Sequence, residues 1–222
     1  MISAIHSKLT RIALFIDGGY FDEVSKYYKY QHSRKARISL EGLQNFIRHK
    51  ISECEKTEES YCQVVESHYF RGRFAAAQAS AAGKLEDQAA FDDVLIRAGI
   101  VQHYMPLRTY RGAPQEMGID VWLSLEAFDL AVHKRFDVLA LIACDADYVP
   151  LVRKLSGIGT RTIVLSWDFQ YEFQDAKGVK QKRETRTSQV LIDTCTYPVM
   201  MAPLIDDRSK KDDAVVKGLF VD

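Results

Sequence analysis

The chain has 222 residues, which is enough for one domain with a sizeable core. Apolar residues make up 47% and charged residues 27%, a composition typical of globular proteins that excludes a disordered chain. The 30 basic and 30 acidic residues cancel, so net charge does not indicate nucleic-acid binding. A neutral total is still compatible with an acidic pocket inside a basic rim, because the local field matters more than the sum.

The cysteines exclude two further classes of protein. Cys54, Cys62, Cys144 and Cys195 form no Cys-x-x-Cys pair and have no zinc-finger spacing, so a structural zinc is not expected. Reduced, scattered thiols instead favour a cytoplasmic location. No segment reaches the roughly 20 apolar residues that a membrane span needs, so we expect no membrane partner.

Short apolar segments alternate with segments of helical periodicity along the chain. The predicted strands are 11–16, 61–70, 100–105, 136–144 and 161–166. The predicted helices are 20–30, 39–51, 83–98, 118–133 and 147 to about 156. Residues 106–114 are predicted to form a loop. The helix over 118–133 carries an apolar stripe at Val121, Leu125, Phe128 and Val132.

This alternation predicts an α/β fold, a three-layer α/β/α sandwich around a mostly parallel sheet. The segments 11–16 and 136–144 are almost continuously apolar, which is typical of parallel strands covered on both faces. We expect the strand order 3-2-1-4-5 of a Rossmann-like sheet. A single domain is predicted over 1–205, with a loop or hairpin over 167–187, a helix and an edge strand within 187–201, and a charged, mobile tail over 206–222.

Aspartates follow two of the predicted strands at their carboxyl ends. Asp17 follows the first strand, and Asp145 and Asp147 follow the fourth. Ligands of a doubly wound sheet bind at this edge, where the strand order reverses, and the order 3-2-1-4-5 places the reversal between these two strands. Asp120 begins the helix that precedes the fourth strand and can reach the same crevice. The sequence therefore predicts up to four carboxylates around one small volume.

Such a cluster favours a divalent metal. Carboxylates at close range repel one another unless one is protonated or a cation neutralises them. Hard oxygen ligands suit Mg²⁺ or Mn²⁺, which bind phosphate oxygens and help to generate hydroxide. Each residue also has a simpler interpretation: Asp17 as a turn residue, Asp147 as a helix N-cap, and Asp120 as a favourable charge at a helix N-terminus. Their shared placement makes the joint interpretation the stronger one.

Four arginines are predicted at the same edge of the sheet. Arg71 and Arg73 follow the second strand, and Arg108 and Arg111 follow the third. Guanidinium groups bind phosphate with two parallel hydrogen bonds, so we interpret them as a phosphate-binding rim. The alternative is four ordinary surface arginines.

The segment after the fifth strand is first aromatic, from Trp167 onward, and then basic, with Lys180, Lys182 and Arg183. Rings that stack on unpaired bases next to cations that follow the backbone suit single-stranded nucleic acid. The alternative is a hairpin whose aromatic residues pack on the domain or on a second subunit. In the second case the protein would be a homodimer.

Three runs carry a resemblance to a known family: RIALFIDGGYF (Arg11–Phe21), MGIDVWLSLEAFDLA (Met117–Ala131) and FDVLALIACDADYVPLVRKLSGIGTRTIVL (Phe136–Leu165). In order and spacing they resemble three motifs of the NYN-domain family, a branch of the PIN-like ribonucleases. The resemblance covers roughly residues 11–201, and the third run is the most specific. It implies a PIN-like α/β/α sandwich and metal-dependent cleavage of RNA.

The resemblance implies roles for the carboxylates position by position. Asp17 matches the aspartate after the family's first strand, and Asp120 matches the aspartate of its KGVD stretch. Asp145 and Asp147 match its GDGDF stretch. Glu126 falls where many members have another aspartate, which makes it a secondary acidic candidate.

The chain also departs from the family pattern. Met117 replaces the usual lysine, Tyr20 replaces an asparagine found in many members, and Cys144 and Ala146 replace glycines of the third motif. The loss of the lysine removes a cation that would contact phosphate or balance the acidic cluster. These departures bear on rate and substrate geometry more than on the fold.

The sequence thus predicts a metal-dependent endoribonuclease with Asp17, Asp120, Asp145 and Asp147 as both metal ligands and catalytic residues, and Mg²⁺ or Mn²⁺ as cofactor. Two alternatives stay open. One is an RNA-binding or scaffold domain that has lost turnover, which the departure at Met117 favours slightly. The other is a metal-dependent phosphatase that acts on small substrates, since similar acidic sheets serve both reactions.

Overall fold

A computed structural model of the chain describes residues 9–110, 113–174, 178, 180–207, 209 and 213–221. Its centre is a six-stranded sheet with the order β11-β8-β7-β1-β3-β4, in which every neighbouring pair is parallel. The strands are β1 (Thr10–Asp17), β3 (Cys62–Arg73), β4 (Val101–Pro106), β7 (Val138–Ile142), β8 (Arg161–Ser166) and β11 (Tyr197–Met200). The α/β fold is thus confirmed. Numbered along the chain, the strands β1, β3, β4, β7 and β8 of this sheet follow the predicted order 3-2-1-4-5, and β11 adds a sixth strand at the edge.

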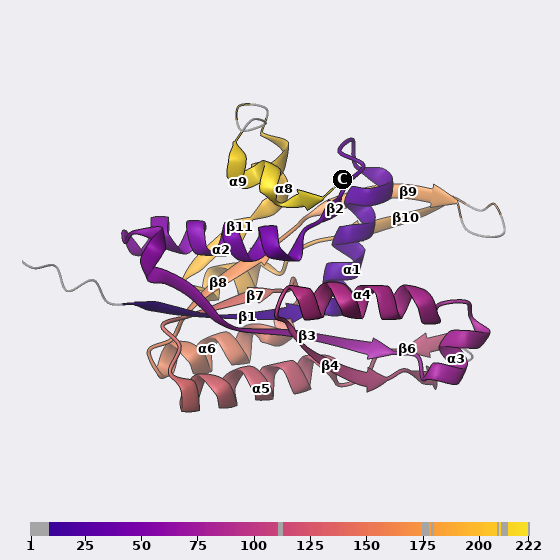
Figure 1. Cartoon of the computed structure of the whole chain (residues 1–222), viewed down its shortest axis with the longest axis horizontal. Coiled ribbons are helices and arrows are strands. Elements are labelled where there is room, and N and C mark those ends of the chain that lie inside the picture. Colours follow the sequence, from indigo (N-terminus) through magenta and orange to yellow (C-terminus); the bar gives the residue numbers. More distant parts are fainter. Residues whose placement is uncertain are drawn as a thin grey trace, which may run out of the picture.

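Helices cover both faces of this sheet (Figure 1). One face packs against α1 (Gly18–Lys26), a π-helix (Tyr27–Gln31), α2 (Leu40–Glu55), α4 (Leu85–Arg97) and α8 (Met201–Asp206). The other packs against α5 (Ile119–Lys134), α6 (Val149–Gly157) and α7 (Gln189–Thr194). Alternate residues of β1 serve the two cores: Ile12 and Leu14 belong to the first, Ala13 and Phe15 to the second. This two-sided burial explains why the strand is apolar at almost every position.

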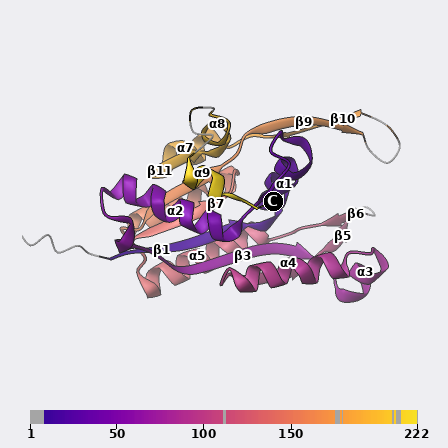
Figure 2. The ribbon, with the colours of Figure 1, turned by 45° about the horizontal axis from the view of Figure 1, so that its top comes forward.

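Smaller elements lie around the sandwich. They are β2 (Arg37–Ile38), the 3-10 turn Glu59–Tyr61, α3 (Ala76–Ala81), β5 (Arg108–Tyr110), β6 (Ala113–Gln115), the 3-10 turn Ala146–Tyr148, β9 (Phe169–Gln174), β10 (Lys180–Thr185), α9 (Ala214–Gly218) and β12 (Phe220–Val221). Within 106–114, which we expected to form a loop, residues 108–110 and 113–114 instead belong to the antiparallel pair β5–β6. Strands β9 and β10 pair as an antiparallel hairpin that extends from the carboxyl edge of the sheet (Figure 2).

Helix α5 turns a different face to the sheet than its sequence suggests. Its buried residues are Ile119, Leu123, Ala127 and Ala131. Of the predicted apolar stripe, Val121, Leu125 and Val132 are exposed, and only Phe128 packs against the core. The two alanines explain the choice, because small side chains let the helix approach the large rings of the sheet closely. A helix that is apolar on most sides has a weak periodic signal, so the sequence pattern did not identify the buried face.

The C-terminal segment is partly folded, which corrects the expectation of a mobile tail over 206–222. Strand β12 pairs with β2, and the backbone N–H of Ser39 donates to the carbonyl of Leu219 at 2.8 Å. A Cβ atom at Gly42 would lie 1.8 Å from the carbonyl oxygen of Gly218, so only glycine allows this close approach to α2. Two-residue strands carry too little pattern to be recognised in a sequence.

We expect Val216→Ala to lower the free energy of unfolding by about 2 kcal/mol, because the side chain is only 2% exposed and its removal leaves a cavity beside α2. Urea unfolding would measure the change. Val221→Ala is the matched control, since Val221 is 48% exposed and its truncation should be neutral. Equal, negligible effects of the two substitutions would show that the segment does not pack on the domain.

Candidate active site

The carboxyl ends of β1 and β7 meet the start of α5 at one cavity of about 410 Å³. Three of the four predicted aspartates line it: Asp17, Asp120 and Asp145. The other lining residues are Gly19, Tyr20, Glu23, Glu116, Gly118, Ile119, Cys144, Glu184, Thr185 and Arg186. The cavity is therefore acidic and lies at the reversal of strand order.

Asp17 is the most buried of these carboxylates, at 7% exposure. It is the N-cap of α1, and its Oδ1 accepts a hydrogen bond from the backbone N–H of Tyr20 at 3.1 Å. The following Gly18 is required by packing, because a Cβ there would lie 2.6 Å from the carbonyl oxygen of Phe70. The simpler, structural role of Asp17 and its place in the cavity therefore coexist.

The hydroxyl of Tyr148 lies between two of the aspartates. Its oxygen is 2.9 Å from Oδ2 of Asp17 and 3.1 Å from Oδ1 of Asp120, and the ring is fully buried. A phenol has one hydrogen to donate, so it cannot satisfy two ionised carboxylates at once. Burial raises the pKa of Asp17, and the charges of Asp120 and Asp145 raise it further, against the hydrogen bonds from Tyr20 and Tyr148. The site therefore favours either a shared proton or a cation.

The donor set fits a hard divalent cation. All the candidate ligands are carboxylate oxygens, which suit Mg²⁺ or Mn²⁺. Across the described part of the chain, no three His, Cys, Asp or Glu side chains are arranged to hold one ion directly. Mg²⁺ commonly uses one or two carboxylates and completes its shell with water and substrate phosphate, so Asp17 and Asp120 with Asp145 nearby match its needs.

Glu116 is a carboxylate of the cavity that the sequence analysis missed. Its Oε1 accepts from the backbone N–H of Gly72 at 3.1 Å and lies 3.8 Å from Nε of Arg71. Burial raises the pKa of Glu116, with further contributions from Asp17 and Asp120. The residue directly follows β6, a three-residue strand that the sequence pattern does not predict. Its spacing of four residues before Asp120 is the only sequence signal that could have found it.

Two predicted carboxylates do not line the cavity. Asp147 is exposed in the 3-10 turn, and it is not the N-cap of the next helix as we expected, because Asp145 holds the cap position of the turn and α6 begins at Val149. The charges of Asp120 and Asp147 add to burial in raising the pKa of Asp145, so Asp147 does act on the site electrostatically. Glu126 lies further along α5, away from the cavity lining.

Two of the four arginines of the predicted rim are engaged in ion pairs. Strand β3 continues to Arg73, so Arg71 and Arg73 lie within the strand and not after it. Arg71 pairs with Asp22 at 2.8 Å, and Arg73 pairs with Asp92 at 2.7 Å while stacking on the ring of Tyr104. Arg108 is exposed on β5, and Arg111 lies outside the described residues.

Trp167 is fully buried, which corrects its predicted role in stacking on RNA bases. The hydroxyl of Tyr20 bonds to its backbone and anchors the start of the hairpin. Phe169 stacks on Tyr27 with ring centroids 4.4 Å apart, so the aromatic face of the hairpin packs on the domain. Tyr171 and Phe173 continue this face and are half-buried.

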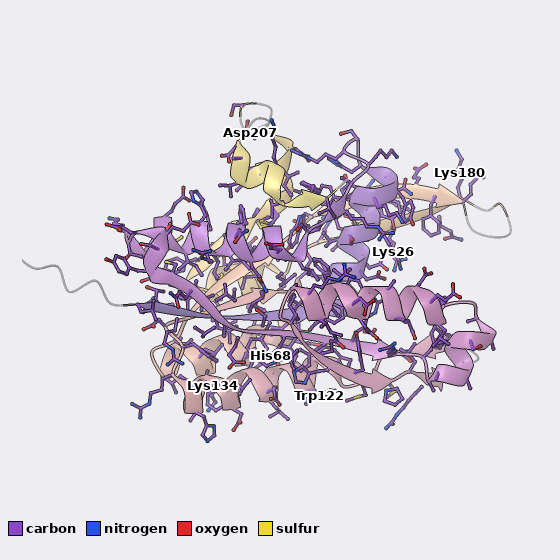
Figure 3. The ribbon with its side chains drawn as sticks, in the orientation of Figure 1. Lys26, His68, Trp122, Lys134, Lys180 and Asp207 are labelled. Carbon is purple, nitrogen blue, oxygen red and sulfur yellow. The ribbon has the colours of Figure 1, made fainter. Side chains whose placement is uncertain are left out.

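The basic residues of β10 divide between the two faces of the hairpin. Arg183 lies opposite Tyr171 and pairs with Glu23 of α1 at 2.8 Å. Lys180 and Lys182 project from the other face and are exposed. Figure 3 labels Lys180 near the far end of the hairpin. The hairpin is thus fixed to α1 on one side and offers cations on the other.

Comparisons with known proteins agree with this arrangement. The family model of the NYN domain matches residues 11–201. A crystal structure of a protein of unknown function from Vibrio parahaemolyticus is 19% identical, with a TM-score of 0.54 over 96% of each chain, which supports the fold alone.

A second crystal structure, Glycyrrhiza uralensis UGT73P12 in complex with glycyrrhetinic acid 3-O-monoglucuronide, is 14% identical over 70% of this chain and 28% of that one. Its TM-score of 0.32 is too low to bear on fold or function. No curated protein matches the chain significantly. The family match covers most of the chain and spans every residue that lines the acidic cavity. The chain therefore belongs to the NYN-domain family, within the PIN-like nuclease superfamily.

Proposed function

We propose that the protein is a metal-dependent ribonuclease that hydrolyses phosphodiester bonds at the acidic cavity. The observation that carries the proposal is the convergence of Asp17, Asp120 and Asp145 at the carboxyl ends of β1 and β7. Membership of a nuclease superfamily supports it. Single-stranded RNA is the expected substrate, because the open cavity lies beside an exposed hairpin with cations on one face.

The aspartates have different proposed roles, according to how deeply each is buried. Asp17 and Asp120 are held by protein hydrogen bonds and would bind the metal. When bound, the metal polarises the phosphoryl group and makes its water more acidic. Asp145 is exposed at the cavity, where it can orient the attacking water and accept its proton. Glu116 stays tied to Gly72 and adds to the negative field.

One observation favours a domain that binds RNA without turnover. Met117 is 51% exposed and is not among the residues that line the cavity, so no side chain takes the place of the family lysine at that position. Cleavage and binding must therefore be measured separately.

None of the helices in the described part of the chain has the length and apolar character that crossing a membrane requires. The homodimer and the cytoplasmic location stay predictions.

The deciding experiment is incubation of the protein with labelled single-stranded RNA in Mn²⁺, Mg²⁺ or EDTA. We expect metal-dependent cleavage that Asp145→Asn reduces at least about 100-fold, because the variant cannot accept the proton of the attacking water. Asp129→Asn is the matched control, since this aspartate is exposed on α5 and does not line the cavity. It should cleave like the wild type.

A wild type that binds RNA but cuts no faster than Asp145→Asn under any metal would refute the nuclease and favour the binding domain. Turnover of a small phosphate ester such as p-nitrophenyl phosphate, with RNA left intact, would instead favour the phosphatase.

A further inference from the structure

Acidic side chains outnumber basic ones among the residues that line the cavity. Six carboxylates line it, from Asp17, Glu23, Glu116, Asp120, Asp145 and Glu184, against a single cationic side chain, that of Arg186. A phosphodiester is itself an anion, so its approach is opposed by this field even after a divalent metal has neutralised part of it. Among the described lining residues, Arg186 is the one group able to attract it.

Other cations near the cavity are held in ion pairs with carboxylates, and none of them lines the cavity; Lys182, for example, pairs with Glu184 at 3.4 Å. Arg71 is held by Asp22 at 2.8 Å and faces Glu116 at 3.8 Å, and its side chain is one-third exposed. Arg183 is held by Glu23 at 2.8 Å on the packed face of the hairpin. Arg186, by contrast, has a side chain that is 78% exposed and pairs only with its neighbour Glu184 among the contacts described. An exposed pair of this kind contributes little, so a phosphate can replace it.

The backbone next to Arg186 is fixed to the segment that carries Asp145. The backbone N–H and the hydroxyl of Thr187 both donate to Oδ1 of Asp168, at 2.8 and 2.6 Å. The backbone N–H of Ser188 donates to the carbonyl of Cys144 at 2.8 Å, directly before Asp145. The exposed side chain of Arg186 is thus placed beside the carboxylates by backbone contacts on its C-terminal side and by β10 on its N-terminal side.

We propose that Arg186 contacts the scissile phosphate and supplies, from the hairpin, the cation that the sequence lacks at Met117. Its guanidinium group leaves Glu184 and donates two hydrogen bonds to the non-bridging oxygens of the phosphodiester, a geometry that a planar fork matches and an ammonium does not. The substrate is then held between the metal ligands on one side and the hairpin on the other. This inference rests on the proposed ribonuclease function.

The test compares Arg186→Gln and Arg186→Lys with the wild type in cleavage of single-stranded RNA with Mn²⁺. A charge-assisted contact predicts that Arg186→Gln lowers kcat/KM by about 10- to 100-fold. Arg186→Lys should recover part of the loss, because it restores the charge without the fork. Arg153→Gln, which removes an exposed arginine of α6 that does not line the cavity, should leave cleavage unchanged.

Two further measurements separate the possible failures. The first is the affinity for Mn²⁺ alone, measured by calorimetry. It should be the same within about twofold in Arg186→Gln and the wild type, and a large loss would show a structural role of Arg186 and overturn the proposal.

The second is the affinity for RNA in Mn²⁺, compared between Asp145→Asn and the double variant that carries both Asp145→Asn and Arg186→Gln. Equal affinities would overturn the contact even if no protein cleaves, whereas absent wild-type cleavage refutes only the ribonuclease. We expect the double variant to bind RNA about 10-fold more weakly.

Discussion

Asp17→Asn is expected to abolish cleavage while leaving the metal-free protein at least as stable as the wild type. The substitution removes a buried carboxylate that we propose as a metal ligand, for which we expect a loss of about a thousandfold in rate, or about 4 kcal/mol of transition-state stabilisation. Asparagine keeps an acceptor for the backbone N–H of Tyr20 and is a good N-cap, so α1 should be retained.

The stability of this variant follows from the crowding of carboxylates. Asp17 is buried close to Asp120 and Asp145, an arrangement that costs free energy when no cation is bound. A neutral amide removes that cost, and a gain of about 1 kcal/mol would raise Tm by about 2–4 °C. Calorimetry in EDTA and in Mn²⁺ checks both parts, because Mn²⁺ should raise Tm of the wild type and not of the variant.

Asp93→Asn is the matched control, since Asp93 is exposed on α4 and lies outside the cavity lining. It should cleave and respond to Mn²⁺ like the wild type. If Asp17→Asn still cleaves, or if Mn²⁺ stabilises it as much as the wild type, Asp17 is not a metal ligand. A metal-free variant that unfolds would show that the charge of Asp17 serves the fold.

The second large effect is a loss of stability in mild acid caused by a histidine pair, in which His68 is buried and His103 is half-buried. Nδ1 of His68 lies 2.9 Å from Nε2 of His103, and Nε2 of His68 lies 3.2 Å from Glu66. Glu66 also pairs with Lys134, and the ring of Phe15 stacks on His68 at 4.9 Å. Figure 3 shows His68 and Lys134 on neighbouring elements, with Trp122 close by.

Burial, and then the neighbouring His103, lowers the pKa of His68 to about 4. The ordinary value of about 6.5 applies in the unfolded chain, so the unfolded state binds more protons between these two values. The stabilisation is therefore complete above about pH 6.5 and is lost as the pH falls towards 4, by about 3 kcal/mol in total. The pKa of His103 is also lowered by burial, which acts in the same direction.

Urea unfolding in EDTA at about pH 7.5 and about pH 5 measures the effect, and the comparison with His68→Gln isolates it. We expect the wild type to lose about 2 kcal/mol more than the variant over this interval. The crowded carboxylates Asp17 and Asp145 have raised pKa values, which act on stability in the opposite direction. The test therefore uses the difference between wild type and variant in how the free energy of unfolding changes with pH, and not the change in the wild type alone. His133→Gln, at an exposed site, should match the wild type. Equal slopes for all three would rule out the histidine pair.

Much of the fold was predictable because strands β1 and β7 are buried on both faces and are therefore apolar at nearly every position. Their ends fix Asp17 and Asp145, so the core of the site followed from the sheet. Trp167 was misplaced because an aromatic residue after a strand looks the same whether it covers the core or faces solvent. Glu116 was missed because its position depends on a contact with Gly72, which is distant in sequence.

The ion pairs of the arginines could not be predicted from the sequence either. Arg71 meets Asp22 only because β3 continues three residues beyond Phe70 and passes beside α1. The C-terminal segment needs partners from β2 and α2, which lie at the other end of the chain. Sequence patterns report local periodicity, whereas these features depend on which side chains meet across the fold.

The single hydrogen of Tyr148 has a consequence for how the site is loaded. Its contacts with both Asp17 and Asp120 are satisfied together when one carboxyl group is protonated and donates to the phenol oxygen. The proposed divalent ion would have to displace this proton into solvent on entering. Its uptake would then be linked to proton release, and we expect its affinity for the site to rise as the surroundings become more alkaline.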